Sequence, residues 1–226
     1  MPQARAGSDR LTPRMMLAAY AAGIFPMAES AESQELHWID PARRGVLPVG
    51  HVHASRSTLR DLRRGGWQGH RNRDFEGALR ACAARPETWI NAELFHIYMA
   101  LHESGHAHSF EVTKGGAFAG AMFGIALNGA FFGESMVSAC RNGSKMALLW
   151  ADWALAAGGF TLFDTQFLTT HLVSLGGREI TRTEYRAHLD FAMTQAAELP
   201  ALMPTAGQLC DAIAAAQLSQ VTTQMS

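Results

Sequence analysis

The feature that most constrains the fold is an uncharged stretch from Gly115 to Gly133, which holds six glycines in 19 residues. That length is close to the length of a transmembrane helix. The pair Asn128-Gly129 favours a different structure, because both residues tolerate the positive φ angles of a tight hairpin turn. We therefore predict two buried strands, 117–127 and 130–138, joined at this pair, with a membrane span as the alternative.

Further elements follow from capping residues, glycine stops and short apolar runs. The predicted helices span Leu11 to Ala22, Ser55 to Arg64, Asp74 to about Ala84, Asn91 to Ser104, Ser144 to Ala157, Thr169 to Leu175, and Thr183 to about Leu199. The predicted N-caps are Thr12, Asp74, Asn91 and Thr183. The other predicted strands are His108 to Thr113 and Phe160 to Asp164. This order of elements indicates an α/β (α+β) fold with a mixed sheet.

A change in residue pattern near position 85 predicts two domains. Residues 1–85 would form a small N-terminal domain with a basic face, and residues 86–200 a larger α/β domain. Residues 201–226 form a C-terminal extension to which the sequence assigns no structure.

The composition excludes a chain that is disordered throughout and one that binds nucleic acid through its overall charge. With 48% hydrophobic and 17% charged residues, the chain has enough apolar side chains for a packed core. The formal net charge is −1, so a nucleic-acid partner would have to meet a local basic patch. The three cysteines are far apart and odd in number, which favours a reducing, cytoplasmic location. The first ten residues lack the apolar core of a signal peptide.

One motif suggests a metal and another suggests phosphate. His102-Glu103-Ser104-Gly105-His106 matches the helical HExxH motif of zinc proteases, but Gly105 falls where the helix should end, so we expect no metal there. Arg56, Arg60, Arg63 and Arg64 share one helical face, which suits the phosphates of a nucleic acid; a solvated charged face is the alternative.

Polar residues follow two apolar strands. Glu134 ends one strand, and Asp164 and Gln166 lie two residues apart at the end of another. Residues two apart in a strand face the same side, so we expect Asp164 and Gln166 to point into one site with Glu134. A simple helix-capping role for Asp164 is the alternative.

Several of these segments, taken together, resemble the leucyl/phenylalanyl-tRNA–protein transferases. The N-terminal segments are Tyr20-Ala21-Ala22-Gly23-Ile24-Phe25-Pro26-Met27, Trp38-Ile39-Asp40-Pro41 with Arg44, and Ser55-Arg56-Ser57. The C-terminal segments are Thr88-Trp89-Ile90, residues 101–109, Gly133-Glu134-Ser135-Met136, Ser144-Lys145, Asp164-Thr165-Gln166, and His171-Leu172 with Ser174-Leu175-Gly176. The resemblance runs from about Leu11 to Leu189.

The resemblance implies a small N-terminal domain and a C-terminal domain related to acyl-CoA N-acyltransferases (GNAT-like). It implies transfer of leucine, phenylalanine or, less readily, methionine from aminoacyl-tRNA to the α-amine of proteins that begin with Arg or Lys. Such products enter the N-end rule degradation pathway of bacteria. No metal or other cofactor and no membrane is involved, and the family carries a string similar to HExxH without zinc.

The residues and the resemblance together predict roles for individual positions, and the family itself implies those of the two tryptophans. We expect Gln166 to contact the attacking amine, Asp164 to orient Gln166, and Glu134 to hold the amine or the terminal ribose. Trp38 and Trp89 would bind the 3′ adenosine. The pocket for the transferred residue would be formed by Tyr98, Met122, Phe131, Met136, Leu148 and Phe163, and tRNA would contact Arg43, Arg44, Arg56, Arg60, Arg63 and Arg64.

Three rival functions remain at this point. An acyl-CoA N-acyltransferase would bind pyrophosphate at Arg141-Asn142-Gly143 and the following helix, although that loop lacks the usual glycine spacing. A non-catalytic RNA-binding module would leave the carboxyl of Asp164 and the amide of Gln166 without a role. A zinc hydrolase would use the HExxH string.

Overall fold

The computed structural model describes residues 11–224, with the side chains described up to residue 218. The helices are α1 (Pro13–Ala21), α2 (Arg56–Arg64), α3 (Phe75–Ala83), α4 (Ala92–Glu103), α5 (Gly143–Ala157), α6 (Thr170–Val173), α7 (Arg182–Met193) and α8 (Ala206–Gln224). The strands are β1 (Phe25–Ala28), β2 (Leu36–Ile39), β3 (Arg43–Leu47), β4 (Trp67–Arg71), β5 (Ala107–Lys114), β6 (Ala117–Leu127), β7 (Ala130–Ser138), β8 (Leu162–Gln166) and β9 (Arg178–Thr181).

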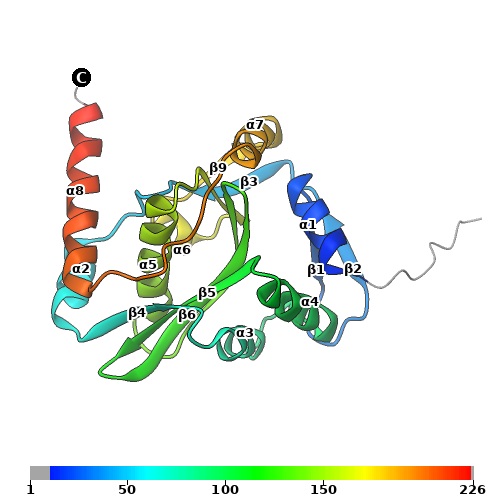
Figure 1. Ribbon diagram of the computed structural model, residues 1–226, viewed down its shortest axis with the longest axis horizontal. Coiled ribbons are helices and arrows are strands. Elements are labelled where there is room, and N and C mark those ends of the chain that lie inside the picture. The colour runs from blue at the N-terminus through cyan, green and yellow to red at the C-terminus, as the bar shows by residue number, and fades with distance from the viewer. Residues whose placement is uncertain (1–10, 225–226) are drawn as a thin grey trace, which may run out of the picture.

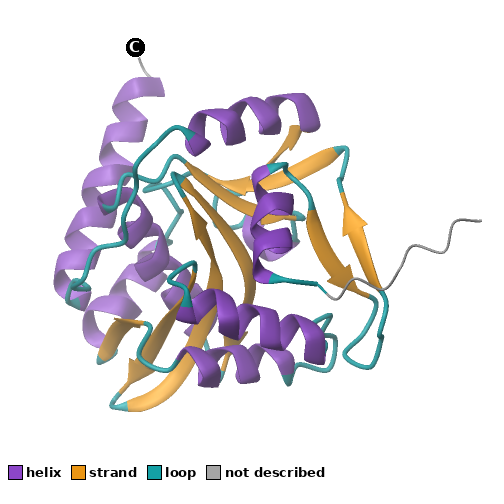
Figure 2. Cartoon of the chain, turned by 45° about the vertical axis from the view of Figure 1, so that its right-hand side comes forward, coloured by secondary structure: helices purple, strands orange, loops and turns teal. Residues whose placement is uncertain are grey.

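A mixed sheet of seven strands forms the centre of the fold, in the order β4-β5-β6-β7-β8-β3-β9. Neighbouring strands are antiparallel except β7 and β8, which run parallel with Phe132 beside Asp164 at the end of their pairing. The α/β prediction is confirmed. The β1-β2 hairpin forms a separate two-stranded sheet beside the main one (Figure 2).

Helices cover both faces of the sheet (Figure 1). One apolar cluster joins α5, α2 and α8 to one face, and a second joins α1, α3, α4 and α7 to the other. The neighbours Phe131 and Phe132 in β7 belong to opposite clusters, as the alternation of side chains along a strand requires. Because both faces are buried, the middle strands are apolar throughout, which explains the uncharged stretch.

The hairpin prediction is confirmed. β6 and β7 pair antiparallel, and Asn128 takes a positive φ of 51° at the turn. The membrane alternative is therefore wrong for this segment, since it forms strands. Across the residues that the structure describes, no helix combines the length and the apolar character that crossing a bilayer needs.

Three predicted N-caps are confirmed by hydrogen bonds from the first helical turn to Thr12, Asp74 and Asn91. Ser55, where a helix was expected to begin, caps α2 in the same way. The predicted N-cap of α7, Thr183, is wrong, because Thr181 accepts the N–H of Glu184. The helix also ends at Met193 instead of near residue 199.

The predicted boundary at residue 85 does not separate two sheets. β3 and β4 precede that position, yet both are strands of the seven-stranded sheet. The part that lies outside this sheet is the shorter segment of α1, β1 and β2. The strand predicted at 160–164 is also shifted, since β8 covers Leu162–Gln166.

The C-terminal extension contains α8, which packs against α2. Leu209, Cys210 and Ile213 are buried in the same core cluster as α5. The extension carries few charges because one side of this helix completes the core.

Candidate active site

A cavity of about 370 Å³ opens where β7 and β8 separate. The last paired residues of these strands are Phe132 and Asp164, and the residues that follow on both strands line the cavity. Such a volume is in the range of pockets for small ligands. β1 closes one side through Phe25 and Met27, which sequence analysis did not assign to the site.

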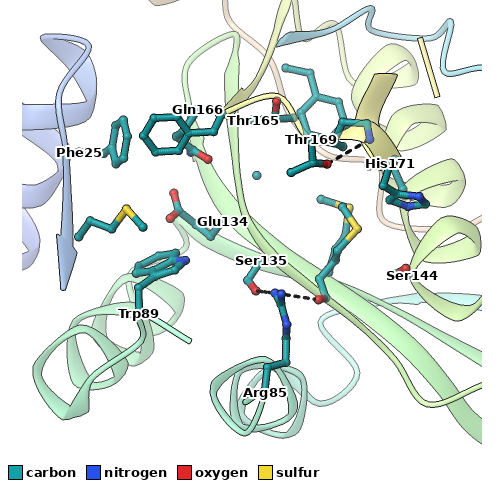
Figure 3. Close-up of a pocket in the computed structure, with 18 residues that line it drawn as sticks. Phe25, Arg85, Trp89, Glu134, Ser135, Ser144, Thr165, Gln166, Thr169 and His171 are labelled. Carbon is teal, nitrogen blue, oxygen red and sulfur yellow. Dashed lines mark hydrogen bonds between the residues drawn. The ribbon is translucent and has the colours of Figure 1, made fainter. Parts of the chain in front are cut away.

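The wall of this cavity is largely apolar, with polar groups at defined places (Figure 3). Four of the six residues expected around the transferred side chain line it: Met122, Met136, Leu148 and Phe163. With Met27, three methionines line the cavity, and their flexible side chains adapt to different apolar shapes. That this cavity holds the transferred amino acid stays a prediction.

Tyr98 and Phe131 are not part of the cavity wall, so their placement in the pocket is wrong. Both are fully buried. Phe131 packs within the core against Phe110 and Phe163. Tyr98 instead donates a hydrogen bond of 2.7 Å to Glu134 Oε2. It therefore holds this carboxyl in place from the buried side.

Glu134 lies at an irregularity of β7, where the register with β6 shifts. A β-bulge redirects a side chain out of the regular alternation, which here helps to place this carboxyl on the cavity wall. Tyr20 Oη donates to its second oxygen at 2.6 Å. Burial raises the pKa of Glu134 to about 7, against the hydrogen bonds of Tyr20 and Tyr98, which lower it. The carboxyl therefore changes its charge near neutral pH.

Gln166 also lines the cavity, next to Glu134 in Figure 3. Its φ of 56° lies in the left-handed region, a strained conformation for a residue with a side chain. In the amide orientation that satisfies its neighbours, Nε2 donates to the carbonyl oxygens of Gly133 (2.9 Å) and Thr165 (3.0 Å). The amide oxygen is then left as the acceptor that this side chain can offer to a ligand.

Asp164 does not point into the cavity, and the prediction that it shares one site with Gln166 is wrong in that respect. The carboxylate is 0% exposed and forms a bidentate pair with Arg44, with hydrogen bonds of 2.6 to 3.1 Å. Tyr185 Oη donates to it at 2.8 Å. The left-handed backbone at Gln166 breaks the expected alternation, so Gln166 turns to the cavity while Asp164 stays inside.

Asp164 nevertheless holds Gln166 in place. The backbone N–H of Gln166 donates to Asp164 Oδ1 at 2.8 Å, which stabilises the strained turn. On β3, Gly45 lies against the same turn, and a Cβ there would approach the carbonyl carbon of Phe167 to 2.8 Å. Asp164 thus contacts the backbone of Gln166, and its expected orienting role in the reaction stays a prediction.

The two tryptophans expected at the adenosine lie in different places. Trp89 lines the cavity. Trp38 is 47% exposed on β2, directly opposite Pro26. Because side chains alternate along β1, Trp38 lies on the other face of the hairpin from Phe25 and Met27, which line the cavity. A shared adenosine site for Trp38 and Trp89 is therefore not formed in this structure.

Five of the six arginines expected to contact tRNA are exposed on the surface. Arg56, Arg60 and Arg64 are exposed on α2. Arg63 is exposed but forms an ion pair of 2.6 Å with Asp211 of α8. Arg43 is exposed on β3, next to the edge strand β9, and pairs with Glu179 of β9 at 3.5 Å. Whether these side chains contact tRNA stays a prediction.

Arg44 is not a surface residue, and its assignment to tRNA binding is wrong. Its side chain is 1% exposed and packs between the rings of Phe25 and Tyr185. Burial alone would lower the pKa of Arg44, but the charge and hydrogen bonds of Asp164 raise it overall. Sequence analysis missed this role because nothing local marks a partner 120 positions away.

The HExxH string does not form the helical motif. α4 ends at Glu103, and Gly105 has a positive φ of 78°, so His106 lies outside the helix. His102 stacks on Phe75 with ring centres 4.1 Å apart and contacts the carbonyl oxygen of Ala107. The two imidazoles are therefore not one helical turn apart, as the zinc motif requires.

Comparison with known proteins shows which family the sequence of this chain matches. The model "Leucyl/phenylalanyl-tRNA protein transferase" matches residues 46–190, and the model of that family's N-terminal domain matches residues 9–42. The N-terminal match takes in α1, β1 and β2.

Curated relatives agree with these matches. A leucyl/phenylalanyl-tRNA--protein transferase of Cereibacter sphaeroides is 54% identical over 83% of this chain and 88% of its own length. Proteins of the same name from a Jannaschia species and from Paracoccus denitrificans are 53% and 52% identical, over 85% and 86% of this chain and 91% and 92% of their own lengths.

Proposed function

The chain belongs to the leucyl/phenylalanyl-tRNA protein transferase family and is an aminoacyltransferase, and we propose that it transfers leucine or phenylalanine from aminoacyl-tRNA to protein N-termini. Methionine would be a poorer donor, and the acceptors would begin with Arg or Lys. The modified proteins would then enter N-end rule degradation. We propose the cytoplasm as the location, since charged tRNA is present there.

The observation that carries this proposal is the composition of the cavity. An apolar wall that includes three methionines lies beside a carboxyl and a carboxamide, Glu134 and Gln166. This arrangement suits an esterified apolar amino acid together with an incoming amine. Because one methylene changes binding in an apolar pocket by only ~1–3 kcal/mol, we expect several apolar residues to be accepted.

The proposed reaction is the aminolysis of an ester. The amine nitrogen forms a bond to the ester carbonyl carbon, and the bond from that carbon to the ribose oxygen breaks. A proton from the amine is transferred to this ribose oxygen, which becomes a hydroxyl group. The amide is more stable than the ester, so no ATP is needed. A protein N-terminus has a pKa near 7.7–8.0, so an appreciable fraction is already neutral at working pH.

The site's contribution would therefore be mainly positioning, which can lower a barrier by several kcal/mol. Gln166 offers its amide oxygen to a hydrogen of the attacking amine, while its nitrogen is held by two carbonyl groups. Glu134, when ionised, attracts the cationic N-terminal residue of the acceptor. Asp164 and Arg44 act behind Gln166 and hold its backbone.

Transfer of labelled leucine from leucyl-tRNA to peptides that differ only in their first residue tests the proposal. We expect incorporation into a peptide that starts with Arg and little into one that starts with Ala. Equal incorporation into both would reject the proposed acceptor, and incorporation into neither would reject the proposed transfer.

A further inference from the structure

A polar cleft of about 410 Å³ lies outside the cavity, between the N-terminal ends of α2 and α5. Three cationic side chains line it, Lys114, Arg141 and Lys145, together with the single carboxylate Asp61. The hydroxyl groups of Ser55, Ser57 and Thr58 complete much of the wall. We call this feature the α2–α5 cleft. None of the roles proposed for the transferase uses it, although the rival acyl-CoA N-acyltransferase would place its pyrophosphate at the same loop.

The charge in the cleft is not balanced. Asp61 accepts from Lys114 Nζ at 3.2 Å and from Asn142 Nδ2 at 3.0 Å, so its two oxygens are occupied. Arg141 and Lys145 form no ion pair within the described part of the chain, residues 11–224. Two cations are thus left to act on a negatively charged ligand.

The backbone adds to this preference. α2 and α5 both begin beside the cleft, so the positive ends of their dipoles lie near it. Asn142 precedes α5 in a left-handed conformation and makes no side-chain cap, its amide being bound to Asp61 instead. Cations next to helix N-termini are the usual surroundings of a bound phosphate group.

The position of the cleft connects two parts of the molecule. Lys145 in its wall follows Ser144, which lines the cavity, in the first turn of α5. On the other side, Arg56 begins α2, and Arg60 lies one turn further along the exposed face. An anionic chain that contacts α2 would therefore pass over the cleft before its end reaches the cavity.

We propose that the α2–α5 cleft binds a backbone phosphate near the 3′ end of the donor tRNA, an inference that rests on the proposed function. Arg141 and Lys145 contact the phosphate oxygens, and Lys114 remains paired with Asp61. The cleft thereby fixes the direction in which the acceptor end approaches the cavity, from α2 past the beginning of α5.

The test compares two donors with the full-length protein. Leucyl-tRNA carries the backbone phosphates, whereas leucyl-adenosine carries the same ester without any phosphate. For Arg141→Ala and Lys145→Ala we expect KM to rise with leucyl-tRNA, and to rise far less with leucyl-adenosine. The slope of log binding constant against log salt for leucyl-tRNA should become shallower by about 0.7 for each single-strand phosphate that the variant no longer neutralises.

Controls separate this proposal from its alternatives. Arg178→Ala removes an exposed arginine of β9 outside the cleft and should leave both donors and the salt slope as in the wild type. Lys145→Arg keeps the charge and should restore most of the salt slope. An unchanged slope in the alanine variants, or an equal rise in KM for both donors, would overturn the proposal.

Coenzyme A supplies a second arm, because its pyrophosphate offers the same chemistry. If it inhibits the wild type, the alanine variants resist this inhibition, and their KM for leucyl-tRNA stays normal, the phosphate in the cleft does not come from tRNA. If the wild type transfers leucine from neither donor, the proposed function itself fails, which is a different result from a failure of the cleft.

Discussion

Replacing Arg44 with methionine should destabilise the fold by about 3–5 kcal/mol, because the substitution leaves Asp164 as an uncompensated buried charge. The two side chains are 1% and 0% exposed, and three hydrogen bonds of 2.6 to 3.1 Å join them. Tyr185 and the backbone of Gln166 would still donate to Asp164, but neither carries a positive charge.

Urea unfolding at pH 8 would measure this change. Arg43→Met is the matched control, since the neighbouring arginine is exposed and paired with Glu179, and such surface pairs contribute about 0–1 kcal/mol. The double variant Arg44→Met/Asp164→Asn removes both charges and should be more stable than Arg44→Met alone. A loss below about 1 kcal/mol, or a double variant less stable than either single one, would refute the reasoning.

Further expectations concern the charge of the site and of α2. Because burial raises the pKa of Glu134 to about 7, transfer should increase as pH rises through 7 and Glu134 ionises; Glu134→Gln should lack this dependence and keep only that of the acceptor amine. The hydrogen bond of Tyr20 lowers this pKa, so Tyr20→Phe should move the same increase to higher pH, and an unmoved profile would contradict the assignment. Replacing Arg56, Arg60 and Arg64 together with alanine should make the salt dependence of tRNA binding shallower, measured by filter binding from about 50 to 200 mM salt, and an unchanged slope would reject this face.

Local sequence patterns predicted the elements that depend on local chemistry. Thr12, Ser55, Asp74 and Asn91 are helix caps because a short polar side chain satisfies the free N–H groups of a first turn. Asn128 permits the hairpin turn for a similarly local reason. Such features need only a few neighbouring residues, which is why they can be recognised in one sequence.

Features that depend on distant residues could not be predicted in this way. β3 lies between β8 and β9, so its place in the sheet is set by strands more than 100 residues away. The burial of Asp164 follows from Arg44 and Tyr185, which come from different elements. The left-handed backbone of Gln166 depends on that carboxylate, and therefore the alternation rule failed there.

The central claim, that the carboxamide of Gln166 positions the amine against an ester held in the cavity, is tested most directly by single-turnover transfer. Leucyl-tRNA would first be bound to the wild type or to Gln166→Ala at saturating concentration, and a peptide that starts with Arg would then be added. We expect leucyl-tRNA to bind both proteins with similar affinity while Gln166→Ala transfers leucine at least about 100-fold more slowly, the usual size of a proton-transfer or positioning contribution. Transfer by the variant at the wild-type rate, or a loss of rate matched by an equal loss of leucyl-tRNA binding, would contradict the claim.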